Sequence, residues 1–161
     1  LTEASNLDYG IDKYQYEGDF LDWILKKENL IASRLDFYFE DIDSSNRYDW
    51  TVQAGLENGL LLPSDGENGK LNLLFKKLTH GMCAKYLVRL MKIKGMNTDA
   101  PLEAVSSNIK SGMSPDVADA VAVLSRYGII TENDVFEFSP EKVAARGEIA
   151  VMLSRTLKLF K

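Results

Sequence analysis

The sequence predicts a single domain that is mostly α-helical and has little strand. In this pseudo-threefold domain, the repeats pack around a central three-helix bundle. Three observations predict this fold. Apolar residues recur at helical spacing in five segments, and Gly and Pro residues separate these segments. One unit of helix, Gly-apolar-apolar, loop and long helix occurs twice, with a third, partial copy before it. The 161 residues match the usual length of one domain.

The first two helices are predicted in the N-terminal half. The first covers about residues 19–33, where apolar residues recur at helical spacing: Phe20, Trp23, Ile24 and Leu30. The second runs from about Asp49 to Asn58, with Asp49 as its N-cap and Gly59 as its stop. Residues 1–18 are polar and aromatic without a clear period, so no element is assigned to them.

The third helix follows Thr79 and ends at Gly95. Its apolar face is formed by Cys83, Leu87, Leu90 and Met91. A Thr at this position can cap the helix, because its hydroxyl accepts a free backbone N–H of the first turn. Cys83 lies on the apolar face and is therefore expected to be an inert thiol in the core.

Two more helices are predicted in the C-terminal half. Pro115 to Tyr127 has Ser114 as its N-cap and Gly128 as its stop. The last helix starts near Ala145 and turns four apolar residues inward: Ile149, Met152, Leu153 and Leu157. Between them, residues 136–138 alternate and could form a very short strand.

The repeat is visible in the spacing of the long helices. Met82 aligns with Glu148, 66 positions later, and this register also sets Arg89 against Arg155. Asp19 aligns with Met82, 63 positions later. The chain therefore divides into a partial first repeat (1–34), a second (35–96) and a third (97–161). Three equivalent amphipathic helices bury all their apolar faces only when they pack around a common axis.

Composition excludes several classes of protein. Nineteen Lys and Arg against 24 Asp and Glu give a net charge of -5, which disfavours non-specific binding to nucleic acid. The longest apolar runs are far shorter than a membrane span, so no membrane insertion is expected. The single Cys excludes an internal disulfide. Because the chain begins with Leu, we expect a fragment or a processed form.

The last unit resembles the S-layer homology repeat. That repeat has Gly-Ile-Ile after a short helix, then Phe-x-Pro, then Thr-Arg-Ala-Glu opening a long helix. This chain has Gly128-Ile129-Ile130, then Phe138-Ser139-Pro140, then 145–148 as Ala-Arg-Gly-Glu, at the spacing of the family. The middle unit is similar to the same repeat, with Thr79-His80-Gly81-Met82 at the long helix. The resemblance covers roughly residues 39–160, with a faint extension to 15–33.

The resemblance implies an extracellular module that anchors a protein to the bacterial cell wall without catalysis. Such modules bind secondary cell-wall polysaccharides, often bearing acidic sugars, in grooves between repeats. An Arg at the first turn of a helix suits a carboxylate, and free N–H groups there favour anions. The alternative is a structural or protein-interaction module that kept the fold and lost the sugar site. No cofactor, metal site or catalytic grouping is expected, since no such set of residues occurs at useful spacing.

Six residues are candidates for the glycan site: Arg146, Glu148, Trp50, His80, Thr79 and Arg47. Arg146 either binds the glycan or pairs with a carboxylate of its own helix. Glu148 is expected to orient Arg146 or to favour the helix dipole. His80 is expected to be an exposed first-turn residue, with a groove-lining role as the alternative, and Thr79 is expected to be a cap.

The aromatic candidates have a second interpretation as core residues. Trp50 lies three positions after Arg47, on which the Trp of the family's short helix falls in an alignment without gaps. For Trp50 and Trp23, packing in the core is the more common role, and a platform for a sugar ring is the alternative. A structure that shows which residues share a groove with Arg146 separates these possibilities.

Overall fold

The computed structural model describes residues 13–33, 38–74, 76–99, 113–131, 134 and 137–160. Within these ranges the chain is mostly α-helical, with five α-helices, one 3-10 turn and no sheet. In chain order the elements are α2 (Glu17–Lys27), α3 (Asp49–Asn58), η1 (Pro63–Asp65), α4 (His80–Ile93), α5 (Pro115–Arg126) and α6 (Arg146–Lys158).

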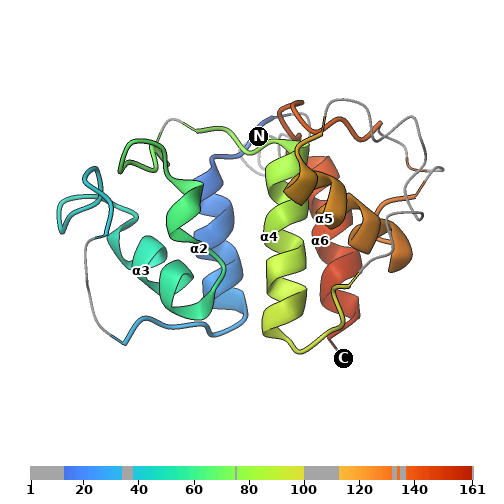
Figure 1. The fold of residues 1–161 in the computed structure, drawn as a ribbon, viewed down its shortest axis with the longest axis horizontal. Coiled ribbons are helices and arrows are strands. Elements are labelled where there is room, and N and C mark those ends of the chain that lie inside the picture. Colours follow the sequence, from blue (N-terminus) through green and yellow to red (C-terminus); the bar gives the residue numbers. More distant parts are fainter. Residues whose placement is uncertain are drawn as a thin grey trace, which may run out of the picture.

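Each short helix packs on the long helix that precedes it in the chain (Figure 1). α3 lies against α2, and α5 lies against α4, while α4 also contacts α6. Side chains join both pairs: the Thr51 hydroxyl donates to Asp22 Oδ1 at 2.9 Å between α3 and α2, and Lys85 Nζ lies 3.2 Å from Asp116 Oδ2 between α4 and α5. A short helix therefore connects the long helix of one unit to that of the next.

The segments before the three long helices are joined to one another in a closed ring. Three isolated antiparallel bridges connect them: Tyr16 with Lys77, Thr79 with Val143, and Ala145 with Tyr14. Tyr16, Thr79 and Ala145 are the N-cap residues of α2, α4 and α6, and they are spaced 63 and 66 positions apart. The bridges therefore occur at the same place before each of the three long helices.

The loops after α3 and α5 are held in the same way. The guanidinium of Arg89 donates to the Leu60 carbonyl at 3.1 Å and to Asp65 Oδ2 at 2.6 Å. In the third unit Arg155 donates to the Ile129 carbonyl at 3.0 Å and to Asp134 Oδ1 at 2.6 Å. The register that aligned Arg89 with Arg155 in the sequence therefore also aligns their hydrogen bonds.

The ends of the helices agree with the sequence to within a few residues in most cases. The prediction of 19–33 was too long at its C-terminal end: α2 ends at Lys27, and Asn29, with φ of 54°, turns the chain out of the helix. Gly59 and Gly128 adopt positive φ at the ends of α3 and α5, as predicted. The strand predicted over 136–138 begins outside the described residues, and 137–138 are not in a strand.

The predicted caps had mixed outcomes. Thr79 is confirmed as a cap, because its hydroxyl accepts the Met82 N–H at 3.2 Å. Asp49 was wrong as a cap, since Tyr48 takes the N-cap position and Asp49 is already the first helical residue. Ser114 takes the N-cap position of α5, but its side chain hydrogen-bonds Asp116 instead of a backbone N–H.

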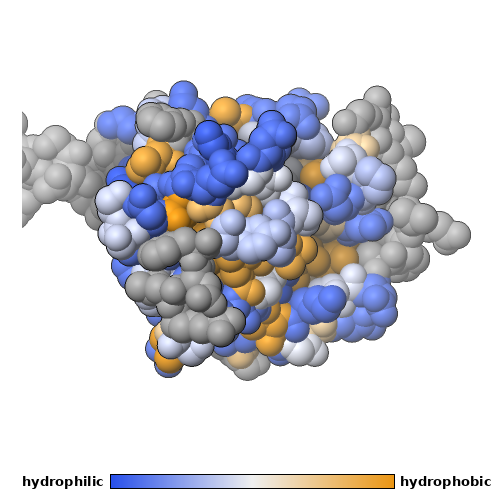
Figure 2. All heavy atoms as spheres, turned by 60° about the vertical axis from the view of Figure 1, so that its left-hand side comes forward, coloured by the Kyte–Doolittle hydropathy of each residue, from blue (hydrophilic) through white to orange (hydrophobic). Residues whose placement is uncertain are grey.

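The core lies between the long helices and under α3 and α5. α4 contributes most to it, with Leu87, Leu90 and Met91 fully buried. Cys83 is fully buried in this core, and burial raises the pKa of its thiol far above the ordinary range, as expected for an inert residue. Some apolar side chains reach the surface, where Figure 2 shows apolar patches between hydrophilic ones on one face.

Candidate functional site

The first residues of α2, α4 and α6 are equivalent by the repeat and carry different chemistry. They are Glu17, His80 and Arg146. The first two are buried, with at most 1% of their surface exposed, whereas Arg146 is exposed. Only one of the three positions, that of Arg146, therefore leaves its side chain open to solvent.

His80 is enclosed by the segment before α6, so the prediction of an exposed residue was wrong. Its Nδ1 accepts the Ser139 N–H at 3.0 Å, and its ring stacks on Phe138 with centroids 5.3 Å apart. Its Nε2 lies 3.1 Å from Glu148 Oε1. The backbone also fixes the position, since the His80 N–H donates to the Lys142 carbonyl. His80 therefore ties α4 to α6 and does not line an open groove.

Glu148 contacts His80 in place of the expected partner, Arg146. Its carboxylate also accepts the Ala145 N–H at 2.8 Å, which caps α6, and lies 3.9 Å from Lys142 Nζ. Burial raises its pKa, but the hydrogen bond from Ala145 and the contact with His80 outweigh burial, so the pKa of Glu148 is lowered overall. The role of Glu148 at the helix dipole stands, but its predicted role of orienting Arg146 does not.

Glu17 is closed off by its own neighbours. Its carboxylate accepts a hydrogen bond from the Tyr86 hydroxyl on α4 and lies 3.7 Å from Lys76 Nζ. Burial raises the pKa of Glu17, and Lys76 and Tyr86 offset only part of that rise. The ionised form of Glu17 is therefore less favourable in the folded protein than in the unfolded chain.

We expect the Glu17→Gln variant to be more stable than the parent protein at pH 7, by roughly 1 kcal/mol. A raised folded-state pKa means that the stability from Glu17 is present below its ordinary value of 4.5 and is lost as the pH rises through the folded pKa. The advantage of Gln should therefore disappear at pH 4. Urea unfolding at both pH values measures it, with the exposed Glu137→Gln as control. An equal difference at both pH values would contradict a raised pKa.

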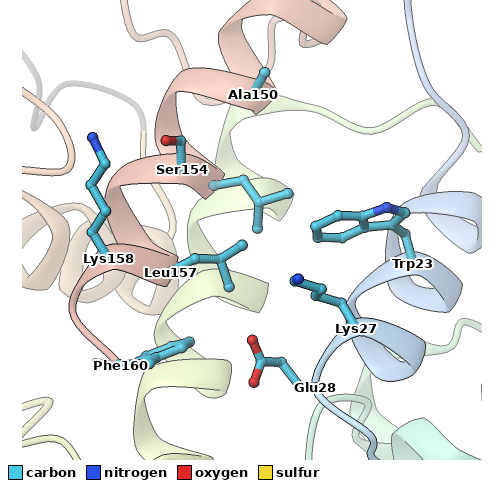
Figure 3. A pocket seen from close by; sticks show the side chains of 9 residues that line it. Trp23, Lys27, Glu28, Ala150, Ser154, Leu157, Lys158 and Phe160 are labelled. Atoms are coloured by element: carbon cyan, nitrogen blue, oxygen red, sulfur yellow. The ribbon is translucent and has the colours of Figure 1, made fainter.

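Arg146 lies in a groove between α2 and α6, which we call the α2–α6 groove. Its wide part is a hollow of about 690 Å³, defined by Trp23, Lys27, Ala150, Leu153, Leu157 and Phe160. Its narrow part, about 150 Å³, shares Trp23, Ala150 and Leu153 with the wide part and is also lined by Arg146, Gln15 and Phe20. Figure 3 shows the wide part, with Trp23 and Lys27 of α2 facing Leu157 and Phe160.

Trp23 is 45% exposed in this groove, which differs from the more common core role expected from its sequence. The residues equivalent to it by the repeat are Tyr86 and Met152, and both are buried. Tyr86 is covered because it reaches Glu17 of α2, whereas Trp23 faces the open α2–α6 groove. An aromatic side chain left exposed beside an Arg is suited to packing on a sugar ring.

The charged side chains of the α2–α6 groove that are not neutralised by an ion pair are cationic. Arg146, Lys27 and Lys158 line it, and within the described part of the chain none of the three forms an ion pair. Glu28 also lines it, but its carboxylate lies 2.7 Å from Lys94 Nζ and is therefore neutralised. The groove thus offers an apolar floor with positive charge around it.

Trp50 and Arg47 lie apart from this groove, on the side of α2 that α3 covers. Trp50 is half-buried, and Lys26 Nζ lies 5.8 Å from the centre of its ring. The guanidinium of Arg47 pairs with Asp19 and lies 4.6 Å from the Tyr48 ring centre. Neither lines the wide or the narrow part of the α2–α6 groove. The six candidates therefore do not form one site.

No family model, curated protein or solved structure matches this chain. Among the described residues, none of the helices combines the length and the apolar character that crossing a bilayer requires.

Proposed function

We propose that this chain is an extracellular, non-catalytic anchoring module of the S-layer homology type. The closed ring of bridges at offsets of 63 and 66 residues supports a pseudo-threefold arrangement of three repeats around a central three-helix bundle. The equivalent bonds of Arg89 and Arg155 support the same interpretation of the second and third repeats. In this proposal the ligand is a secondary cell-wall polysaccharide, bound between repeats on the bacterial cell surface.

The observation that carries the proposal is that Arg146 and Trp23 line the same hollow. A guanidinium donates paired hydrogen bonds to a carboxylate, and an exposed indole packs on the face of a sugar ring. An acidic glycan offers both a carboxylate for the guanidinium and a sugar ring for the indole. The equivalent positions, Glu17 and His80, are buried and bonded to neighbours, so the proposal places one glycan site in the domain and not three.

The Arg146→Ala variant is expected to lose retention on purified cell-wall sacculi by at least tenfold, because a charge-assisted hydrogen bond contributes about 1.5–3 kcal/mol. Arg47→Ala is the matched control, since Arg47 is exposed but lies outside the α2–α6 groove. The bound fraction is measured by co-sedimentation. Equal retention of Arg146→Ala and the parent protein removes Arg146 from the mechanism, and no retention of either removes the glycan function.

A second candidate is a structural or protein-interaction module. It is favoured by the burial of Glu17 and His80, which closes two of the three equivalent positions, and by the apolar floor of the wide part of the groove. A protein partner on the cell surface would then take the place of the glycan. If the correctly folded parent protein does not bind sacculi, this second candidate is favoured.

A further inference from the structure

α6 differs from the other two long helices in what covers it. α3 lies on α2 and α5 lies on α4, but among the described residues no helix takes the equivalent place on α6. The difference is visible in the exposure of one stripe of residues. At equivalent positions this stripe reads Gly18, Leu21 and Leu25 on α2, Gly81, Ala84 and Val88 on α4, and Gly147, Ala150 and Ser154 on α6. The residues of this stripe on α2 and α4 are buried or half-buried, whereas Ala150 and Ser154 on α6 are exposed.

The glycine at the start of this stripe lies against neighbouring segments on α2 and α4, and these include the start of the short helix. A Cβ on Gly18 would lie 2.5 Å from the Tyr48 ring, at the start of α3. A Cβ on Gly81 would lie 3.0 Å from the Pro140 carbonyl oxygen and 3.3 Å from Val117 in the first turn of α5. Gly147 occupies the same position on α6. Because glycine in a helix costs about 1 kcal/mol relative to alanine, the glycines of α2 and α4 mark positions where a neighbouring segment approaches the helix closely.

The exposed residues of α6 all lie on one face. They are Arg146, Ala150, Ser154 and Lys158, spaced four apart, and all four line the α2–α6 groove. Leu153 and Leu157 line the groove beside this stripe, and Figure 3 shows Leu157 on the side of α6 that faces α2. Ala150 and Ser154 are small, so the axis of a second helix can approach α6 closely here.

Charge also matches a helix of this type. α3 and α5 each carry a carboxylate in the first turn, Asp49 and Asp116. In α5 the first turn lies against Gly81, next to His80, so a helix in the equivalent place would begin beside Gly147 and Arg146. Arg146, Lys27 and Lys158 give the groove a positive charge that complements an acidic first turn.

We propose that the α2–α6 groove binds a short amphipathic helix of a partner protein, similar in chemistry to α3 and α5. This helix has ten to twelve residues, an apolar stripe and an acidic first turn. It completes on α6 the packing that α3 and α5 provide on α2 and α4. The proposal goes beyond glycan binding and does not depend on it.

The test uses a synthetic peptide of residues 114–131, which carries the α5 sequence and no Trp. Binding is measured with the Trp50→Phe variant of the full chain, in which Trp23 is the only tryptophan. We expect saturable binding and a blue shift of the Trp23 emission, because a docked helix removes this indole from water. Adding Ala150→Glu and Ser154→Glu should weaken binding at least tenfold, since two carboxylates would then face the acidic peptide.

The control adds the same charge elsewhere. Ser44→Glu with Ser64→Glu introduces two carboxylates at exposed positions outside the groove, and peptide binding should not change. Ala150 and Ser154 are exposed and Glu is a good helix former, so circular dichroism should show that both double variants fold. Failure of the peptide to bind at millimolar concentration, or binding that both double variants leave unchanged, overturns the proposal.

Sedimentation of the unmodified chain tests a second copy as the occupant. A dimer that Ala150→Glu with Ser154→Glu converts to a monomer, without any peptide binding, would assign the groove to self-association and overturn the proposal. Arg146→Ala on sacculi remains a separate measurement, so the glycan function and the helix site can fail independently.

Discussion

The Asp65→Ala variant is expected to unfold with a free energy about 3 kcal/mol lower than that of the parent protein. The Asp65 side chain is 7% exposed and accepts two hydrogen bonds from Arg89, at 2.6 and 3.0 Å. It also accepts the Leu62 N–H at 2.8 Å. Removal of the carboxylate leaves a guanidinium, 17% exposed, without its ion pair and a backbone donor without its partner.

Urea unfolding followed by circular dichroism measures this loss, and the third unit provides the matched comparison. Asp134 accepts from Arg155 at 2.6 Å and from the Thr131 N–H at 2.9 Å, so Asp134→Ala should cost a similar free energy. Asp43→Ala is the control, because Asp43 is exposed and bonds only the nearby Ser45 and Asn46. A loss below about 0.5 kcal/mol for both Asp65→Ala and Asp134→Ala would show that these bonds do not hold the repeat together.

Asp65 and Asp134 illustrate which contacts could be predicted from the sequence and which could not. Spacing alone aligned Arg89 with Arg155, and the structure gives these residues equivalent bonds. Their acidic partners, Asp65 and Asp134, were not predicted. A signal was present: Asp65 and Asp134 each lie six residues after the glycine that ends a short helix, Gly59 and Gly128. The equal distance of Asp65 and Asp134 from these glycines therefore indicates that the two carboxylates are equivalent, which their residue type alone does not show.

The candidate site was harder to predict than the helices for a physical reason. Helical period and stop residues are local, so α3, α4 and α5 and the start of α6 were placed to within one or two residues. Exposure in the first turn of a long helix depends on which distant segment lies against it. His80 is buried by residues 138–142 and by Glu148, and Trp23 is exposed because nothing described covers that face of α2. No periodic pattern in α2 or α4 encodes those neighbours.

The burial of His80 leads to the second large expected effect: His80→Ala should lower the free energy of unfolding by about 3 kcal/mol. The substitution leaves a cavity at a fully buried position and removes the acceptor of the Ser139 N–H. It also removes the ring that stacks on Phe138 and the contact with Glu148. Arg146→Ala is the matched control at the equivalent position of α6, and because Arg146 is exposed its cost should be below about 0.5 kcal/mol.

A double-mutant cycle separates the contact with Glu148 from the packing of the ring. Glu148→Gln keeps an oxygen for the Ala145 N–H, so the cap of α6 is retained while the charge beside His80 is removed. If the 3.1 Å contact between His80 Nε2 and Glu148 Oε1 joins α4 to α6, the two substitutions should be non-additive by about 1 kcal/mol. Additive losses would assign the effect of His80 to packing against Phe138 and to Ser139 alone. The cycle thus determines whether the contact with Glu148 adds to the stability that His80 gains from packing against Phe138 and from its hydrogen bond with Ser139.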